Sequence, residues 1–594
     1  MILLEEQLRG NVVAAVNNLY AQNIDGSIIK IDKTPVEFQG ELTVIIFPFV
    51  KLSKKNPEQT AEEIGKALKE NSSIISSFNV VKGFLNIVFT DDYWITVLHQ
   101  ISKVDNYGNL NSTGKKIVVE YCGPNTNKPL HLGHVRNMLL GFSVSKLLEA
   151  AGNEVHRVNI LNDRGIAICK SMVTYIRTGN NETPESTGIK GDHFVGKYYV
   201  EYQKIFEQEV GLLEMSNIAR AEAEKTADIY MEAAEMLQKW EAGDAEVLAL
   251  WNTMNNWVYA GFEETYKKIG IDFEKEYKES DYYLFGKKYV LEGLDNNIFF
   301  KKDDGSVWVD LINDGLDQKV LLRADGTSVY ITQDIGVAKA RYVDFAMDTS
   351  VYVVANEQDY HFKVLKLVIQ KLNEPFADGI YHLNYGMVDL PEGKMKSRQG
   401  NVVDADDLID GMQAEANDFL TASEKSKDLT EEERNKLSGQ IGLAALKYFI
   451  LKIDPKKRIL FDPKESIDLH GNTGPFIQYT YARIQSVFRK LHAEGFKHHD
   501  IQLPSPDAPE KELIVLLNQY PSIIKSAAEN YSPAEVGNYI YLLAKKFNTF
   551  YADHSIANAE SVEKKHLRVL ISFKIANVLK HGLGLLGIEA PERM

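Results

Sequence analysis

The feature that most constrains the fold is a strand, a short loop, a helix and a second strand in direct succession. An apolar run at 117–121 ends in a Gly-Pro-Asn turn at 123–125, and a helix with one apolar stripe begins near Gly133. A second apolar run at 154–160 follows that helix directly. This order is typical of the opening unit of a doubly wound parallel sheet, so we predict an α/β fold of the Rossmann type.

The chain has 594 residues, which is too long for one hydrophobic core, and its patterns divide it into several parts. Residues 1–105 carry both helix and strand signals and predict a small α/β domain, followed by a linker rich in Asn and Gly. Residues 115–400 predict the doubly wound domain, with charged helices inserted at about 195–270. A connecting helical segment at 401–454 leads to an all-helical domain at 455–594.

Further strand signals fill in the first two domains. Runs at 78–81 and 84–89 flank a Lys-Gly turn and predict a hairpin. In the doubly wound domain, strand patterns resume after the inserted helices. They lie at 307–309, 320–322, 329–331 and 351–354.

Composition sets limits on partners. The net charge of −16 disfavours nucleic acid when taken alone, but local clusters of Lys and Arg permit one basic face. No apolar run approaches the ~20 residues that span a bilayer, and the acidic N-terminus lacks the basic start of a secretory signal. We therefore expect a cytoplasmic protein that binds no membrane.

The two cysteines, Cys122 and Cys169, are isolated in the sequence. Neither lies in a CxxC pair or near paired histidines, which excludes a disulfide framework and a zinc site built from cysteines. We interpret both as small buried residues and predict no protein-bound metal.

The first candidate site is the loop between the first strand and its helix. Its two histidines, three residues apart at a helix N-terminus, face the same way, towards the positive end of the helix dipole. Neutral or protonated imidazoles there can donate to phosphate oxygens, a lysine adds a full charge, and a glycine leaves room for a flat ring. Most isolated pairs of this kind are only core or surface histidines, but the position at a strand-to-helix crossover favours a nucleotide site. The segment comprises Pro124, Asn125, Thr126, Asn127, Lys128, Pro129, Leu130, His131, Leu132, Gly133 and His134.

The second candidate site is a basic loop far downstream, at 393–400. It packs three cations between two glycines, and such a loop could close over a triphosphate, although a solvated turn is the more common explanation of this pattern alone. Its central residues are Lys394, Met395, Lys396, Ser397 and Arg398.

Together, HLGH after the first strand and this KMxxS-like loop resemble the signature pair of class I aminoacyl-tRNA synthetases. Proteins similar to pantothenate synthetase share the first element but are much shorter. Three further segments resemble the arginyl-tRNA synthetase family: LRADGTSVYITQD at 322–334, ANEQDYHF at 355–362 and GPFIQYTYARI at 474–484. The closing PERM also looks like that family's C-terminus, so the resemblance covers nearly the whole chain.

The resemblance implies a two-step reaction for translation: ATP activates L-arginine to arginyl-adenylate, and the arginyl group then passes to the terminal ribose of tRNA-Arg. It assigns catalysis to residues 115–400, additional tRNA binding to residues 1–105 and anticodon binding to the helices at 455–594. ATP would arrive with Mg²⁺ as a substrate complex, without a tightly bound cofactor. We expect a monomer whose partners are tRNA-Arg, arginine and ATP.

Family positions also imply residue roles. A guanidinium has five donors in a rigid plane and favours carboxylates that accept in pairs. Tyr330 and Asp334 are four apart, so on a helical turn both would face one pocket. The implied arginine-binding residues are Asn125, Glu279, Tyr330, Asp334 and Gln358, and the implied catalytic residues are His131, His134, Lys128 and Lys394. Asn162 and Asp163 resemble a family segment near the site, with no role assigned.

One departure concerns the basic loop. Ser397 stands where the usual loop has its last lysine, and Lys396 precedes it. The arginyl family often lacks that lysine and carries one before the histidine pair, where this chain has Lys128. We therefore expect Lys128 to supply the missing charge.

Two other functions compete with this interpretation. One is a class I ligase for another amino acid, such as glutamine, glutamate or cysteine; the Tyr330–Asp334 pair and the absence of a cysteine-based zinc site disfavour it. The other is a synthetase-like tRNA-binding protein that has lost catalysis, which the presence of His131, His134 and Lys394 disfavours.

Overall fold

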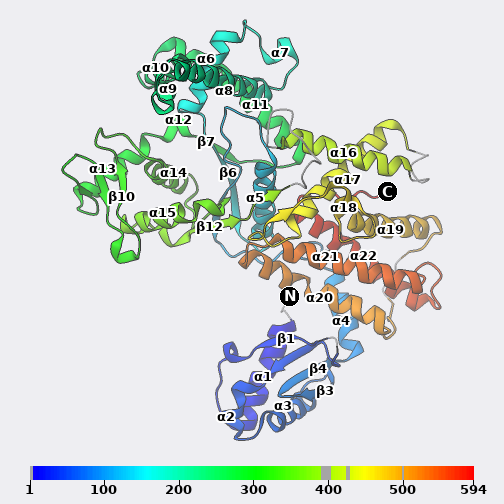
Figure 1. Ribbon diagram of the computed structural model, residues 1–594. Helices are drawn as coiled ribbons and strands as arrows, with labels where there is room; N and C mark the ends of the chain where they lie inside the picture. Colours follow the sequence, from blue (N-terminus) through cyan, green and yellow to red (C-terminus); the bar gives the residue numbers. More distant parts are fainter. Residues whose placement is uncertain (1–3, 36, 390–402, 423–428, 498, 500) are drawn as a thin grey trace.

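The computed structural model describes residues 4–35, 37–389, 403–422, 429–497, 499 and 501–594. Figure 1 shows a small N-terminal domain at the bottom, a central sheet, a projection of helices at the top and a group of C-terminal helices on the right.

The N-terminal domain is an antiparallel sheet with helices. Its strand order is β1-β2-β4-β3, and Val81 pairs with Phe84 across the turn of the hairpin, as the sequence predicts. Asn56 caps the second long helix, and a proline in the first turn suits that position. The elements are α1 (Leu4–Tyr20), β1 (Ile31–Lys33), β2 (Leu42–Ile45), α2 (Val50–Ser53), α3 (Pro57–Asn71), β3 (Ile75–Val81), β4 (Phe84–Phe89) and α4 (Asp91–Ser102).

The central sheet has five parallel strands in the order β12-β11-β5-β6-β7. The chain runs outward from the middle strand β5 to β7 and then returns to build β11 and β12 on the other side. The strand order therefore reverses between β5 and β11, which confirms the doubly wound prediction. The strands are β5 (Lys116–Glu120), β6 (Glu154–Leu161), β7 (Lys275–Lys278), β11 (Thr349–Ala355) and β12 (Ile380–Tyr385).

Helix α5 (Leu132–Ala150) joins the sheet to the C-terminal helices, and most of its residues are buried. Ser143 donates to the backbone oxygen of Leu585 at 2.8 Å. The predicted linker is packed as well: the hydroxyl of buried Tyr107 donates to the backbone oxygen of Leu517 at 2.7 Å. The C-terminal helices thus support the same helix that carries the histidine pair.

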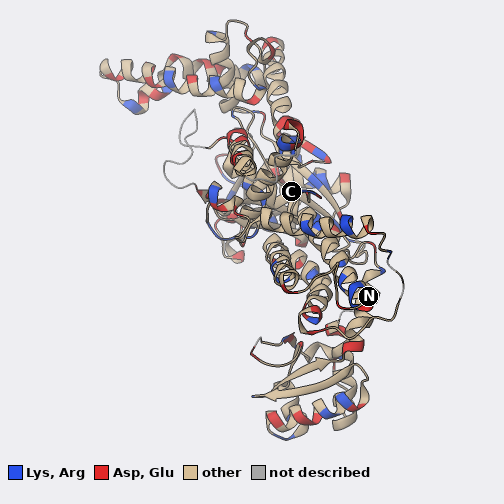
Figure 2. Cartoon of the chain, turned by 90° about the vertical axis from the view of Figure 1, so that its right-hand side faces the viewer, with Lys and Arg blue, Asp and Glu red and all other residues tan. Residues whose placement is uncertain are grey.

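The helical projection lies between β6 and β7 in the sequence. Basic and acidic residues are interspersed along its helices (Figure 2). These helices begin at Ile166, earlier than the start of the insertion expected at about 195–270. Its helices are α6 (Ile166–Thr178), α7 (Pro184–Thr187), α8 (Gly191–Met215), α9 (Arg220–Thr226), α10 (Asp228–Glu241) and α11 (Ala245–Ile269).

Between β7 and β12 the chain forms four α-helices, a three-stranded antiparallel sheet and the central strand β11. The prediction of a strand at 329–331 is wrong, because α14 begins at Tyr330. Only Val329 is extended, at the N-cap, and burial of Ile331 and Ile335 outweighs the strand preference of this β-branched run. The elements are α12 (Glu279–Tyr282), α13 (Phe285–Asp295), β8 (Phe300–Lys301), β9 (Val307–Val309), β10 (Lys319–Leu322), α14 (Tyr330–Phe345) and α15 (Asp359–Lys371).

The rest of the described chain is mostly helical, with one short parallel pair of strands, β13 and β14. No helix in the described ranges is both long and apolar enough to cross a bilayer. Cys122 and Cys169 are both buried and unbridged, as the sequence indicates. The elements are β13 (Val388–Asp389), α16 (Ala405–Ala422), α17 (Glu431–Leu451), β14 (Ile459–Leu460), α18 (Pro463–Ile467), α19 (Gly474–Ala493), α20 (Ala508–Glu529), α21 (Pro533–Asp553) and α22 (Val562–Leu585).

Candidate active site

The carboxyl ends of four neighbouring strands bring the candidate residues to one edge of the central sheet. Asn125 and the histidine segment follow β5, Asp163 follows β6, Glu279 follows β7, and Gln358 follows β11. The strand order reverses between β5 and β11, and ligands of open α/β sheets bind at such a point. The sheet topology therefore predicts one common site for segments that are far apart in the sequence.

His131 and His134 stand at the N-terminus of α5 with their rings 3.9 Å apart between centroids. Nδ1 of His131 accepts from the backbone N–H of Gly133 at 3.1 Å, and Nδ1 of His134 accepts from the backbone N–H of His131 at 3.2 Å. Because each Nδ1 accepts, the proton of each neutral ring is on Nε2. Both side chains can thus donate one N–H to a phosphate oxygen.

Burial, together with the nearby charge of Lys128, lowers the pKa of His131 to about 4. Burial also holds the pKa of His134 well below its usual range, with contributions from His131 and Lys128. Both imidazoles are therefore neutral near pH 7. A Cβ at Gly133 would lie 3.0 Å from Cε1 of His131, so glycine at this position also leaves room for the His131 ring.

Lys394 and the rest of the basic loop lie outside the described residues, but both flanks of the loop are placed. The backbone N–H of Leu132 donates to the oxygen of Val403 at 2.9 Å. On the other flank, Arg136 of α5 donates to the oxygen of Met387 at 3.1 Å. The histidine segment and its helix therefore hold both attachments of this loop.

Two acidic side chains lie near each other in the site. The Glu279 side chain is 14% exposed, and burial is the main cause that raises its pKa to about 7. Arg164, 3.9 Å away, lowers that pKa, whereas the charges of Asp163 and Asp334 raise it. A group with two acceptor oxygens beside a second carboxylate suits the guanidinium of arginine.

Asp334 has a partner that the sequence reasoning missed. Nε2 of His361 lies 2.5 Å from Oδ2 of Asp334. Burial lowers the pKa of His361, but the hydrogen bond to Asp334 and its charge outweigh burial, so the pKa is raised. His361 lies three residues after Gln358 in the segment ANEQDYHF. Its place in that family-like segment is the sequence signal that could have identified it as a site residue.

The other three expected arginine contacts have exposed side chains. Tyr330, the first residue of α14, is 79% exposed, and Asn125 and Gln358 are exposed at the ends of their strands. The structure brings Glu279 and Asp334 into electrostatic contact, whereas the side chains of these three described residues do not bond to either carboxylate.

Asp163 anchors the segment that carries Glu279. Its buried carboxylate accepts from the backbone N–H of Ser280 at 2.9 Å, from the Ser280 hydroxyl at 2.7 Å and from the Tyr259 hydroxyl at 2.9 Å. The preceding residue, Asn162, forms a backbone bridge with Asn125. The Asn162–Asp163 pair therefore links both ends of the candidate arginine site, which gives it the role that the sequence left open.

Within the described ranges, one group of side chains has the spacing of metal ligands: Asp192, His193 and Asp406. The ammonium of Lys190 lies 2.6 Å from Asp406 and 3.2 Å from Asp192, so a protein cation already neutralises these carboxylates. This group does not suit a resident metal ion.

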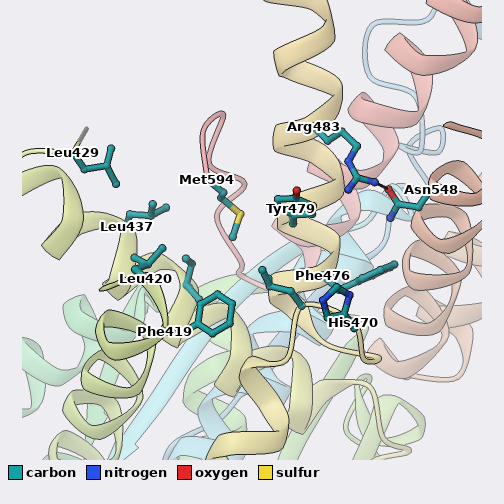
Figure 3. Close-up of a pocket in the computed structure, with 12 residues that line it drawn as sticks. Phe419, Leu420, Leu429, Leu437, His470, Phe476, Tyr479, Arg483, Asn548 and Met594 are labelled. Atoms are coloured by element: carbon teal, nitrogen blue, oxygen red, sulfur yellow. Dashed lines mark hydrogen bonds between the residues drawn. The ribbon is translucent and has the colours of Figure 1, made fainter. Parts of the chain in front are cut away.

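A cavity of about 390 Å³ lies among α16, α17, α19 and the C-terminal end (Figure 3). Most of its lining is apolar, and Arg483 forms its polar side. The guanidinium of Arg483 lies 4.8 Å from the Tyr479 ring centroid and donates to Asn548. Met594, the last residue, also lines the cavity.

Comparisons with known proteins cover the whole chain. The protein-family model described as tRNA synthetases class I (R), catalytic domain, matches residues 96–462. The DALR anticodon binding domain matches residues 477–594, and the arginyl tRNA synthetase N-terminal domain matches residues 6–89. The arginine–tRNA ligases of Parabacteroides distasonis and Bacteroides thetaiotaomicron are each 51% identical to this chain, with complete coverage of both sequences.

Solved structures agree on the fold. The arginyl-tRNA synthetase of Thermus thermophilus superposes with a TM-score of 0.81 at 22% identity, and that of Plasmodium falciparum with 0.79 at 20% identity. Both alignments cover all of this chain and all of the other. The family matches and the full-length relatives together place the chain in the arginyl-tRNA synthetase family of class I.

Proposed function

We propose that the protein is an arginine–tRNA ligase, which activates L-arginine with ATP and transfers the arginyl group to tRNA-Arg. One observation carries this proposal: two neutral imidazoles at a helix N-terminus lie at the same sheet edge as the carboxylates of Glu279 and Asp334. The first pair suits phosphate, and the second suits a guanidinium. Membership of the arginyl family supports the same assignment.

In the first step, an oxygen of the arginine carboxylate attacks the α-phosphorus of ATP, and the bond to the pyrophosphate oxygen breaks. Nε2–H of His131 and of His134 donates to phosphate oxygens, while Lys128 and Lys394 balance their charge. Mg²⁺ accompanies ATP as part of the substrate. In the second step, a ribose hydroxyl of tRNA attacks the arginyl carbonyl, AMP leaves, and no protein nucleophile is needed.

We propose that Asn125, Tyr330 and Gln358 complete the arginine site when substrate is present. Their side chains are exposed at strand and helix ends, where they are available to the amino and carboxylate groups of arginine. The monomeric state and the cytoplasmic location remain predictions from the sequence.

The cavity beside Arg483 is the proposed contact for a nucleobase of tRNA. Aromatic side chains and an arginine beside an apolar cavity suit a base that is unstacked from its neighbours, because every base presents a π-face. The match of the DALR anticodon binding domain to residues 477–594 supports this use.

Aminoacylation with each of the twenty amino acids and total tRNA tests the proposal. We expect charging with arginine alone. Charging with glutamine, glutamate or cysteine would favour another class I ligase, and no charging at all would favour a tRNA-binding protein without catalysis. In the same assay, Tyr479→Ala should raise the KM for tRNA and leave the KM for arginine unchanged.

Arginine use should depend on pH through Glu279. Because its pKa is raised to about 7, Glu279 is protonated and uncharged in free enzyme below that pH, and it attracts the guanidinium only above it. The kcat/KM for arginine, which reports ionisations of the free enzyme, should therefore increase as pH rises through about 7. Glu279→Gln should lower kcat/KM and remove this inflection.

His361 requires a control, because its raised pKa acts in the same direction: loss of its proton releases Asp334 from a competing cation. His361→Gln removes that ionisation and retains Glu279. An inflection near pH 7 that persists in Glu279→Gln and disappears in His361→Gln would assign the pH dependence to the histidine instead.

A further inference from the structure

The start of helix α8 contacts the segment that follows the basic loop. Nζ of Lys190, the N-cap residue, donates to Oδ2 of Asp406 at 2.6 Å, to the Thr265 hydroxyl at 2.6 Å and to Oδ2 of Asp192 at 3.2 Å. The Asp192 side chain is fully buried. A buried carboxylate that loses its partner is strongly destabilising, so Asp192 favours this position of the Lys190 ammonium.

Asp404 and Asp406 connect this contact to the proposed ATP site. Oδ1 of Asp404 accepts from the backbone N–H of Asp406 at 2.8 Å and so caps α16, while its Oδ2 lies 3.5 Å from Nε2 of His193. The backbone around Asp404 lies against the histidine segment: the N–H of Ala405 donates to the oxygen of Leu130 at 3.0 Å. Lys190 and His193 thus bind the segment 404–406, whose backbone pairs directly with the loop before α5.

The next turn of α8 contacts the same loop directly. A Cβ added at Gly196 would lie 2.7 Å from Cδ of Pro129 and 3.6 Å from Cα of Lys128. The first distance is far inside ordinary van der Waals contact. Glycine therefore allows the helix to approach the loop that carries Lys128, and the rigid proline ring could not move aside without moving the backbone.

We propose that residues 190–196 form a positioning clamp for the ATP site, in which Lys190 and His193 hold Asp404 and Asp406 while Gly196 seats the loop at Lys128 and Pro129. This inference rests on the proposed function. It gives the base of the helical projection a part in adenylate formation, although none of its residues touches a reacting atom. Misplacement of catalytic groups by ~1 Å can cost on the order of 100-fold in rate, so a clamp of this kind has a measurable effect.

The decisive test compares two glycines of the same helix. Gly196→Ala introduces the close contact with Pro129, whereas a Cβ at Gly211 meets nothing within 4 Å. Alanine is a better helix former than glycine, so neither variant should fail to fold because of its helix propensity. We expect Gly196→Ala to slow single-turnover formation of arginyl-adenylate by about 10- to 100-fold, with KM for arginine unchanged, and Gly211→Ala to match the unmodified enzyme.

A second comparison separates positioning from stability. Lys190→Met and Asp406→Asn should each lower the rate of adenylate formation, the double variant should be no slower than the slower single one, and Lys190→Arg should restore part of the rate. Equal rates for Gly196→Ala and Gly211→Ala, or Lys190→Met with a lower melting temperature and a normal rate, would overturn the clamp. Failure of the unmodified enzyme to form arginyl-adenylate would instead overturn the proposed function.

Discussion

Lys128→Ala is expected to slow formation of arginyl-adenylate by about 2–4 kcal/mol, on the order of 30- to 1000-fold, a size typical of losing one charge-stabilising donor. The charge of Lys128 lowers the pKa of both His131 and His134, so this ammonium lies close enough to act on the same phosphates. The segment that carries it leads into α5 and lies against Gly196 of α8.

Single-turnover adenylate formation with saturating tRNA measures this effect. Lys146→Ala is the matched control, because Lys146 lies on α5 but pairs with Glu149 at 2.9 Å, away from the histidines. Lys396→Ala should cost much less than Lys128→Ala, because a shift of one residue points a side chain elsewhere. If Lys396→Ala proves the more damaging change, Lys128 does not replace the lysine missing at Ser397.

Asp334→Asn is expected to reduce kcat/KM for arginine by about 1.5–3 kcal/mol, or roughly 10- to 150-fold, while KM for ATP stays unchanged. The substitution keeps the shape of the side chain but removes the charge that faces His361 and that we propose binds the guanidinium of arginine. Asp334 also raises the pKa of Glu279, so Glu279 should ionise at lower pH in this variant.

Asp344→Asn provides the comparison on the same helix. Asp344 accepts from Lys275 and from Tyr277, each at 2.6 Å, and makes no contact with Glu279 or His361 in the described residues. Steady-state kinetics with arginine and with ATP should therefore separate the two variants. Unchanged arginine kinetics in Asp334→Asn would remove this residue from the pocket.

Local signals predicted the elements that place the ATP site. The strand at 117–121, the helix start near Gly133 and the second strand needed only periodicity and turn residues, and the reversal of strand order then brings distant loops together. Tyr330 shows the limit of such signals. The run from Val329 to Ile331 has strand preference, and only packing against distant residues decides that a helix begins there.

The contacts that were not predicted share a physical cause. His361 meets Asp334, and Lys190 meets Asp406, across long stretches of sequence. A side chain that bridges two loops leaves no periodic trace in the sequence, because its partner depends on how the helices pack. Asp163 illustrates the same point. Its sequence segment resembles one near the site but indicates no role, and only its bonds to Ser280 and Tyr259 define that role.

The packing of α5 has a consequence for biosynthesis. This helix has His131 at its N-cap and packs against C-terminal helices, where the Ser143 hydroxyl donates to the backbone oxygen of Leu585. Domains generally fold in order as the chain is synthesised. Here α5 is synthesised long before α22, whose last residue bonds to it. A nascent or prematurely terminated chain that lacks α22 would therefore hold His131 and His134 on a helix without this support.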